Sequence, residues 1–262
     1  MRMNKKGTVL WWAIFLFIVG VAVFLVRISQ STGLEVKGDW QMSFLENNYL
    51  EAEKELLMID SVTKNIGIDI ARTMAKNAGF VANSPCGKYL NTNLLIKDGK
   101  WCLPNIKDGF ETLAKSKLNK KLSKYGYKNA TYTGNYFYAI GEKKNISSKE
   151  GIYYFNTDFS VNLGYSFDDY MLLFEETKRI FSLCSLPEDL KVCLDKNKRD
   201  YWNYGACESP IDIIVPGEKQ VAFCVQSPNL YTLPEGDGFV RTFSSVYYSL
   251  AIDFSPTAEI VN

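Results

Sequence analysis

The feature that most constrains this chain is an uncharged run of nineteen residues near its start, from Thr8 to Val26. Thirteen of them are Leu, Ile, Phe or Val, each of which favours insertion into a bilayer by roughly 0.3–0.6 kcal/mol. As a helix the run reaches about 28 Å, close to the thickness of the hydrocarbon core. We therefore expect a transmembrane signal anchor over residues 8–27, with the lipid bilayer as partner of residues 8–26. A buried core helix and a cleaved secretory signal are the alternatives, but no Ala-x-Ala cleavage site follows.

The charges beside this run predict its orientation. Residues 1–7 carry three basic side chains, whereas only Arg27 follows the run closely. Because cytoplasmic flanks are enriched in Lys and Arg, residues 1–7 are expected to be a cytoplasmic basic segment. A linker over residues 28–40 would follow, and residues 41–262 would form an extracytoplasmic domain of a single-pass cell-membrane protein.

The absence of histidine narrows the chemistry that the chain can perform. It removes Ser-His-Asp and Cys-His nucleophile activation and His-ligated zinc sites, so we expect a protein that is not an enzyme and needs no cofactor or metal. The enzymatic alternative is an envelope hydrolase that uses paired carboxylates. Its candidate acids are Asp168, Asp169, Glu175 and Glu176. Acidic residues in the first turn of a helix are also explained by their favourable interaction with the helix dipole.

Net charge gives no reason to expect a nucleic-acid partner. Residues 1–27 hold four of the 30 basic residues and none of the 29 acidic ones, so the remainder has a net charge of −3. Nucleic-acid binding favours a strongly basic domain instead.

Hydrophobic periodicity predicts an α+β fold after the anchor. Apolar residues recur at three- and four-residue steps in three segments, a long amphipathic helix over residues 41–78 and shorter helices over 106–125 and 166–183. Stretches rich in Tyr, Phe, Thr and Val predict strands that would form a mainly antiparallel sheet covered by these helices. The predicted strands are 131–140, 151–163, 211–215, 221–226 and 239–254, with Pro216–Lys219 as a hairpin turn between the third and the fourth.

The six cysteines all follow the anchor, on the side expected to be oxidising, which indicates a disulfide framework. No close Cys-x-x-Cys pair supports metal binding, and free buried thiols are the other alternative. Fifteen pairings are possible. The pairing that we expect joins neighbours in the sequence: Cys86 with Cys102, Cys184 with Cys193, and Cys207 with Cys224.

Surface features of the predicted domain include a basic helix face and two glycosylation sequons. The second helix and the residues after it carry six lysines, which predict contact with anionic lipid head groups or an acidic glycan, or else an ordinary solvated face. These are Lys115, Lys117, Lys120, Lys121, Lys124 and Lys128. The sequons begin at Asn129 and Asn145 and predict surface exposure.

Lys5-Lys6-Gly7 before the apolar run resembles the processing site of archaeal type IV pilin-like precursors. Cleavage between Gly7 and Thr8 is what this resemblance implies. The sequence departs from pilins in two ways: Trp12 stands where a Glu is common, and Ser29–Gly33 and Gly38 are expected to interrupt the long first helix, because glycine disfavours a helix interior by about 1 kcal/mol.

A wider resemblance covers most of the chain. It is to uncharacterised archaeal membrane-anchored surface proteins, and the residues that carry it, besides Lys5-Lys6-Gly7, are Tyr49–Asp60, Ser84–Tyr89, Trp101–Pro104 and Leu250–Phe254. It implies a cell-surface location. We expect a non-catalytic protein that binds or organises other envelope proteins or glycans. The alternatives are a pilin-like filament subunit and the carboxylate hydrolase, and a homo-oligomer is compatible with each.

Overall fold

A computed structural model describes most of the chain as two compact units. The first comprises residues 1–55 and 144–155, and the second comprises 56–143 and 156–262. The residues that the structure does not describe are 1–4, 150, 187–188, 208–217, 235–240 and 256–262. The predicted strand 211–215 and the first half of the predicted turn Pro216–Lys219 therefore lie outside the described residues.

The smaller unit is built on a helix that is longer than predicted. Helix α1 runs from Lys5 to Phe44 and continues through the π-helical turn η1, Leu45–Tyr49, into α2, Leu50–Lys76. The predicted interruption of the helix at Ser29–Gly33 and Gly38 is therefore wrong, because this segment is helical. No proline lies in it, and a glycine disfavours a helix by only about 1 kcal/mol, which neighbouring backbone hydrogen bonds offset. Among the described residues, no helix has both the length and the apolar character that crossing a membrane requires.

A two-stranded sheet of β6, Lys143–Ser147, and β7, Ile152–Asn156, contributes the rest of the smaller unit. Tyr153 packs against two aromatic rings of the helical segment, with centroids 6.4 Å from Phe44 and 5.8 Å from Tyr49. Asn48, which is fully buried, donates its side-chain amide to the carbonyl of Gly151 at 3.1 Å. These contacts join segments about a hundred residues apart in the sequence.

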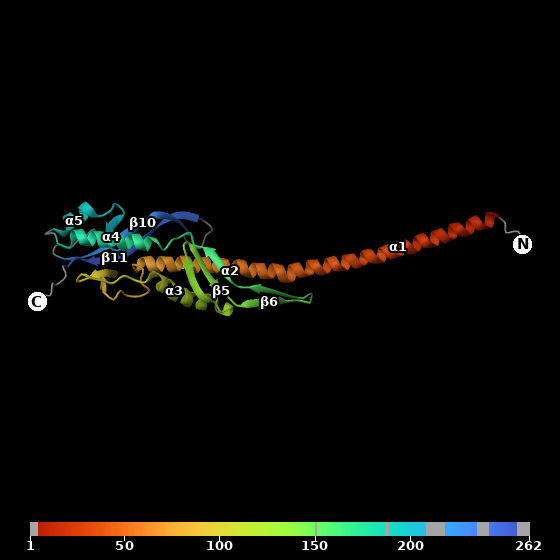
Figure 1. Ribbon diagram of the computed structural model, residues 1–262, viewed down its shortest axis with the longest axis horizontal. Helices are drawn as coiled ribbons and strands as arrows, with labels where there is room; N and C mark the ends of the chain where they lie inside the picture. Colours follow the sequence, from red (N-terminus) through yellow and green to blue (C-terminus); the bar gives the residue numbers. More distant parts are fainter. Residues whose placement is uncertain (1–4, 150, 187–188, 208–217, 235–240, 256–262) are drawn as a thin grey trace. The chain divides into compact units, whose positions relative to one another are not determined.

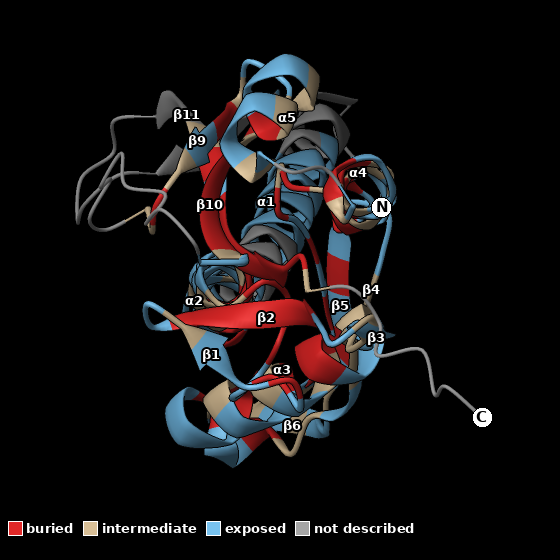
Figure 2. Ribbon diagram, turned by 90° about the vertical axis from the view of Figure 1, so that its left-hand side faces the viewer, coloured by how far each residue is buried: buried red, intermediate tan, exposed pale blue. Residues whose placement is uncertain are grey.

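The larger unit contains a six-stranded sheet with the order β1-β2-β11-β10-β9, and β3 pairs with β2. Only β2 and β11 run parallel, so the predicted mainly antiparallel sheet is confirmed. Figure 2 shows that β2 and β10 carry buried residues along much of their length. The strands are β1, Lys88–Tyr89; β2, Thr92–Lys97; β3, Lys100–Trp101; β9, Trp202–Tyr204; β10, Gln220–Pro234; and β11, Arg241–Asp253.

A second, three-stranded antiparallel sheet has the order β4-β5-β8, and its strands are Lys128–Thr133, Tyr136–Ile140 and Phe159–Asn162. The segment 131–140, predicted to be one strand, forms the end of β4 and all of β5. Gly134 adopts a positive φ of 56° at the turn between them, a conformation that glycine adopts without strain.

The helices of the larger unit bury the faces that their periodicity predicts. On α2, four apolar side chains of the predicted stripe are fully buried: Ile59, Ile66, Ile70 and Met74. Ala78, two residues beyond the end of the helix, is buried as well. Helix α3, Ile106–Lys121, is capped by Asn105, whose side chain accepts a hydrogen bond from the Asp108 amide. It ends before the predicted Tyr125, which lies in a 3₁₀ turn closed by Gly126 at φ 58°.

The predicted third helix starts later than expected and is followed by a short one. Helix α4 spans Asp169–Cys184, and no side chain caps it at Asp168. Ser166 instead accepts a hydrogen bond from the Asp168 amide in the preceding turn. Helix α5, Leu190–Asn197, follows and lies next to α4 (Figure 1).

Gly67 provides a test of close packing in this core. A Cβ at this position would overlap the buried side chain of Leu163 and approach Phe137 to 3.2 Å. We expect Gly67→Ala to lower the free energy of unfolding by about 1–3 kcal/mol, because overpacking exceeds the gain in helix propensity. Gly38→Ala is the matched control, since a Cβ there meets nothing within 4 Å, and it should be neutral or stabilising by up to about 1 kcal/mol. Chemical denaturation of both variants measures this, and equal effects would contradict the packing argument.

Candidate ligand-binding site

The larger unit contains a partly open cavity of about 370 Å³, within the size range of small-molecule sites. Its walls come from α4, β10, β11 and the segment Arg199–Trp202. Polar and apolar side chains both face it. The cavity is therefore the candidate functional site, and its walls derive from parts of the sequence that lie up to 80 residues apart.

Helix α4 supplies one wall because of its residue spacing. Asp169, Leu173, Glu176 and Arg179 follow one another at steps of four, three and three residues, which places their side chains along one face of a helix. All four line the cavity. The helix thus presents a row that is acidic at its first turn, apolar next and charged further on.

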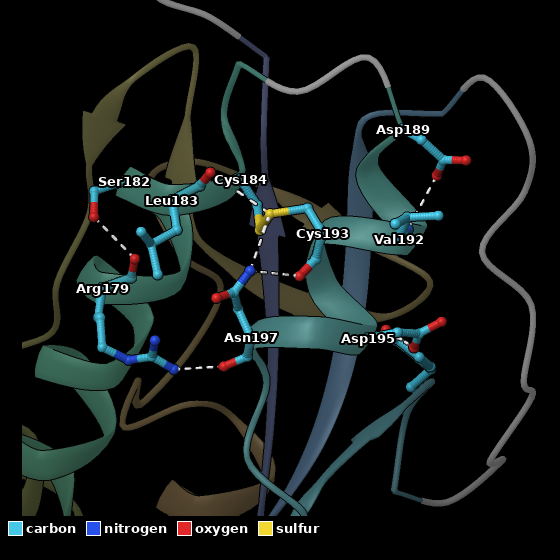
Figure 3. Close-up of a disulfide and its surroundings, with 10 residues drawn as sticks. Arg179, Ser182, Leu183, Cys184, Asp189, Val192, Cys193, Asp195 and Asn197 are labelled. Atoms are coloured by element: carbon cyan, nitrogen blue, oxygen red, sulfur yellow. Dashed lines mark hydrogen bonds between the residues drawn. A yellow bond between two sulfur atoms is a disulfide. The ribbon is translucent and has the colours of Figure 1, made fainter.

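Helix α5 holds the opposite wall in place through the second disulfide, Cys184–Cys193 (Figure 3). The guanidinium of Arg179 adds a hydrogen bond of 2.6 Å to the carbonyl oxygen of Asn197 at the end of α5. These two links join α4 to α5. Arg199 lies two residues beyond the end of α5. The disulfide and this hydrogen bond therefore also help to position the segment Arg199–Trp202 at the cavity wall.

Asp169 is buried at the inner end of the cavity and accepts three hydrogen bonds. Its donors are Ser227 Oγ at 2.6 Å, Asn229 Nδ2 at 2.7 Å and Tyr248 OH at 3.2 Å. The Tyr248 hydroxyl also lies 3.0 Å from that of Tyr165, and burial raises the pKa of Tyr165 well above its ordinary value, so this phenol stays neutral. A buried carboxylate requires such donors, so Asp169 fastens α4 to β10 and β11.

Glu176 is the centre of an ion cluster at the outer part of the cavity. Arg179 binds both of its oxygens, with Nη2–Oε1 at 2.6 Å and Nε–Oε2 at 2.9 Å, and Arg199 Nε lies 3.3 Å from Oε1. The hydrogen bonds from Arg179 are the main reason that the pKa of Glu176 is lowered, although burial opposes them. The side chain of Glu176 is 13% exposed, that of Arg179 is 36% exposed and that of Arg199 is 58% exposed, so Arg199 is the more solvent-exposed of the two cations.

Trp202, the first residue of β9, is completely buried, and its indole N–H has no hydrogen-bond partner among the described residues. An indole nitrogen can only donate, and leaving a buried donor unpaired is unfavourable by about 1–3 kcal/mol. Trp202 lines the cavity, but its indole nitrogen is itself buried.

The structure brings together three of the four candidate carboxylates predicted from the sequence. Asp169, Glu175 and Glu176 line the cavity, whereas Asp168 is exposed outside it. Sequence reasoning missed Arg179, which the helical spacing could have indicated. It also missed Arg199 and Trp202, for which no local pattern gives a signal.

The other predicted site residues lie outside this cavity. All three expected disulfides form, which confirms the predicted pairing. Both sequon asparagines, Asn129 and Asn145, are exposed. Of the six lysines, Lys117 is partly buried and forms an ion pair of 2.6 Å with Asp69; the exposed ones are Lys115, Lys120, Lys121, Lys124 and Lys128.

Comparisons of the chain with protein-family models, curated proteins and solved structures find no match. Within the described part of the chain, no group of three or more Cys, Asp or Glu side chains is arranged to hold a metal ion.

The ion cluster predicts a pH-dependent contribution to stability. We expect Glu176→Gln to lower the free energy of unfolding at pH 7 by about 1–2 kcal/mol, because two arginines lose their charged partner. Since the pKa of Glu176 is lowered in the folded state, this contribution is present above about pH 4.5 and is lost as the pH falls through the lowered pKa. Denaturation curves at pH 7 and pH 3 measure it. Glu175→Gln, an exposed neighbour, should change stability by less than about 0.5 kcal/mol; a pH-independent loss in Glu176→Gln would contradict the ion-pair explanation.

Proposed function

We propose that this chain is a single-pass membrane-anchored surface protein whose extracytoplasmic domain has a non-catalytic binding role. The observation that supports a membrane anchor is the distribution of exposed apolar side chains on α1. The six consecutive residues Ile14–Val19 are all apolar and each is at least 42% exposed. At 100° per residue they face every direction around the helix axis, and a helix that is apolar all round requires an apolar environment.

The disulfides support an extracytoplasmic domain. Three bridges in one chain are typical of an oxidising compartment and rare in the cytosol. The exposed sequon asparagines and the exposed lysines of α3 and β4 fit a domain that meets envelope glycans or anionic head groups. We propose that these residues form a contact surface for such groups.

The cavity supports binding rather than hydrolysis. A general acid needs a raised pKa near neutral pH, whereas that of Glu176 is lowered by its arginine partners. Asp169 has its oxygens occupied by three donors from the protein itself. Both carboxylates are therefore engaged in holding the cavity together, which does not favour the carboxylate-hydrolase alternative.

A pilin-like filament subunit is the second candidate, and one observation favours it. In pilins the first helix runs unbroken into the globular head, and here α1 passes through Ser29–Gly33 and Gly38 without interruption into η1 and α2. Together with Lys5-Lys6-Gly7, this continuity removes one of the two departures from the pilin pattern. Trp12 remains as the other.

The anchor is tested by charge substitutions within α1. We expect Val19→Arg combined with Val23→Arg to move the full-length protein from the membrane fraction to the soluble fraction, because each arginine disfavours insertion by roughly 2.5–3.5 kcal/mol. Asp39→Arg, placed beyond the apolar run, is the control and should leave the protein in the membrane fraction. Protection of the domain from protease added to intact cells would contradict its external location.

The N-terminal mass of the protein recovered from membranes separates the two candidates. A chain that retains residues 1–7 supports a simple signal anchor, and a chain that begins at Thr8 supports pilin-type processing. Gly7→Leu is the matched variant, since it should block processing without removing a charge. A start near residue 30 would contradict both, because it would mean that the apolar helix is cleaved off.

A further inference from the structure

We propose that the cavity formed by α4, β10, β11 and Arg199–Trp202 binds a neutral pyranose sugar without covalent chemistry. This inference rests on the proposed binding role and names its ligand class. At about 370 Å³ the cavity lies near the small end of ligand sites, which suits a ligand no larger than a short oligosaccharide.

Arg199 offers hydrogen-bond donors to a ligand in the cavity. Arg199 uses only Nε in its described contacts, at 3.3 Å from Glu176, and its side chain is 58% exposed. A guanidinium has five N–H donors, so Arg199 has donors left for oxygen atoms in the cavity.

The walls also offer acceptors that need a donor. Glu175 is exposed, lines the cavity and has no ion pair in the described part of the chain. The side-chain amide nitrogen of Gln226 is bound to Ser245 Oγ at 2.7 Å, which turns the amide dipole so that its oxygen is the group available to accept. A ligand that fits must therefore both accept and donate, and a hydroxyl group does both.

Charge favours a neutral ligand over an ion. Three acids and two bases line the cavity, but Asp169 and Glu176 are already satisfied by protein donors. An anion drawn to Arg199 would meet Glu175, and a cation drawn to Glu175 would meet Arg199. The lining carries a net charge of −1, so an anion is not favoured. A cation would be repelled by the exposed Arg199, whereas neutral hydroxyl groups pair with both charges without repulsion.

The cavity also has an apolar strip that fits the C–H face of a sugar ring. Leu172, Leu173 and Val225 line the cavity beside the polar groups. A pyranose has an apolar C–H face and a rim of hydroxyl groups, so its face can cover this strip while its hydroxyl groups pair with Arg199 and Glu175. A purely apolar ligand would leave these two charged groups without partners.

Saturation-transfer NMR on the full chain, solubilised in a detergent without a sugar head group, tests this inference. The probes are glucose, galactose, mannose, N-acetylglucosamine and their disaccharides, with inorganic phosphate and free lysine as charged probes. We expect at least one sugar to bind, with Glu175→Gln and Arg199→Gln each weakening it about tenfold. Lys191→Gln, an exposed charge on α5 outside the cavity, is the control and should leave the Kd unchanged. Tighter binding of disaccharides than of monosaccharides would indicate a glycan chain as the source of the sugar.

Three results would overturn the inference. Sugar binding that both cavity variants retain in full would place the site elsewhere. Binding of phosphate or lysine alone would reject the neutral sugar and leave the binding role intact. Binding of no probe, while the protein still fractionates with membranes, would reject the sugar site without rejecting the anchor.

Discussion

The larger unit depends on the burial of one helix face against its sheets. Ile59, Ile66, Ile70 and Met74 of α2 are inaccessible to solvent, and burial of each such side chain stabilises the fold by about 1.5–3 kcal/mol. Gly67 lies in the same helix and allows Leu163 and Phe137 to approach the backbone. This close approach explains why a residue of low helix propensity stands in the middle of a long helix.

The cavity is a consequence of how α4 and α5 are fastened. Asp169 ties the first turn of α4 to β10 and β11 through Ser227, Asn229 and Tyr248. At the other end, the Cys184–Cys193 bridge ties α4 to α5. The cavity lies between these two attachments, so its polar walls are held in place before any ligand enters. Such preorganisation reduces the conformational entropy that is lost when a ligand binds.

The smaller unit follows a different principle. Its α1 helix is apolar on every side over Ile14–Val19, whereas α2 is apolar on one stripe. A helix with one apolar stripe finds its partner inside the protein, and a helix that is apolar all round requires an apolar medium or other helices. Continuity from α1 through η1 to α2 joins these two kinds of helix without a linker.

Local sequence patterns were sufficient to predict the features that depend on residues close together in the sequence. The α2 stripe, the mainly antiparallel sheet and the three disulfides between neighbouring cysteines were all predicted correctly, because periodicity and short loop closure are properties of residues close together in the sequence. The predicted interruption at Ser29–Gly33 and Gly38 was wrong, since the low helix propensity of glycine is a small energetic effect in a long helix.

The sequence by itself determined the α+β class, the apolar N-terminal run, the cysteine framework and the absence of histidine chemistry. Only the tertiary structure decided the cavity, because Arg199 and Trp202 meet Asp169 and Glu176 through folding of segments that have no shared pattern. It also decided that two of the candidate acids are satisfied internally, by donors from distant strands and by Arg179 and Arg199. Whether a carboxylate is free or engaged depends on its neighbours in space, and the order of residues along the chain does not contain that information.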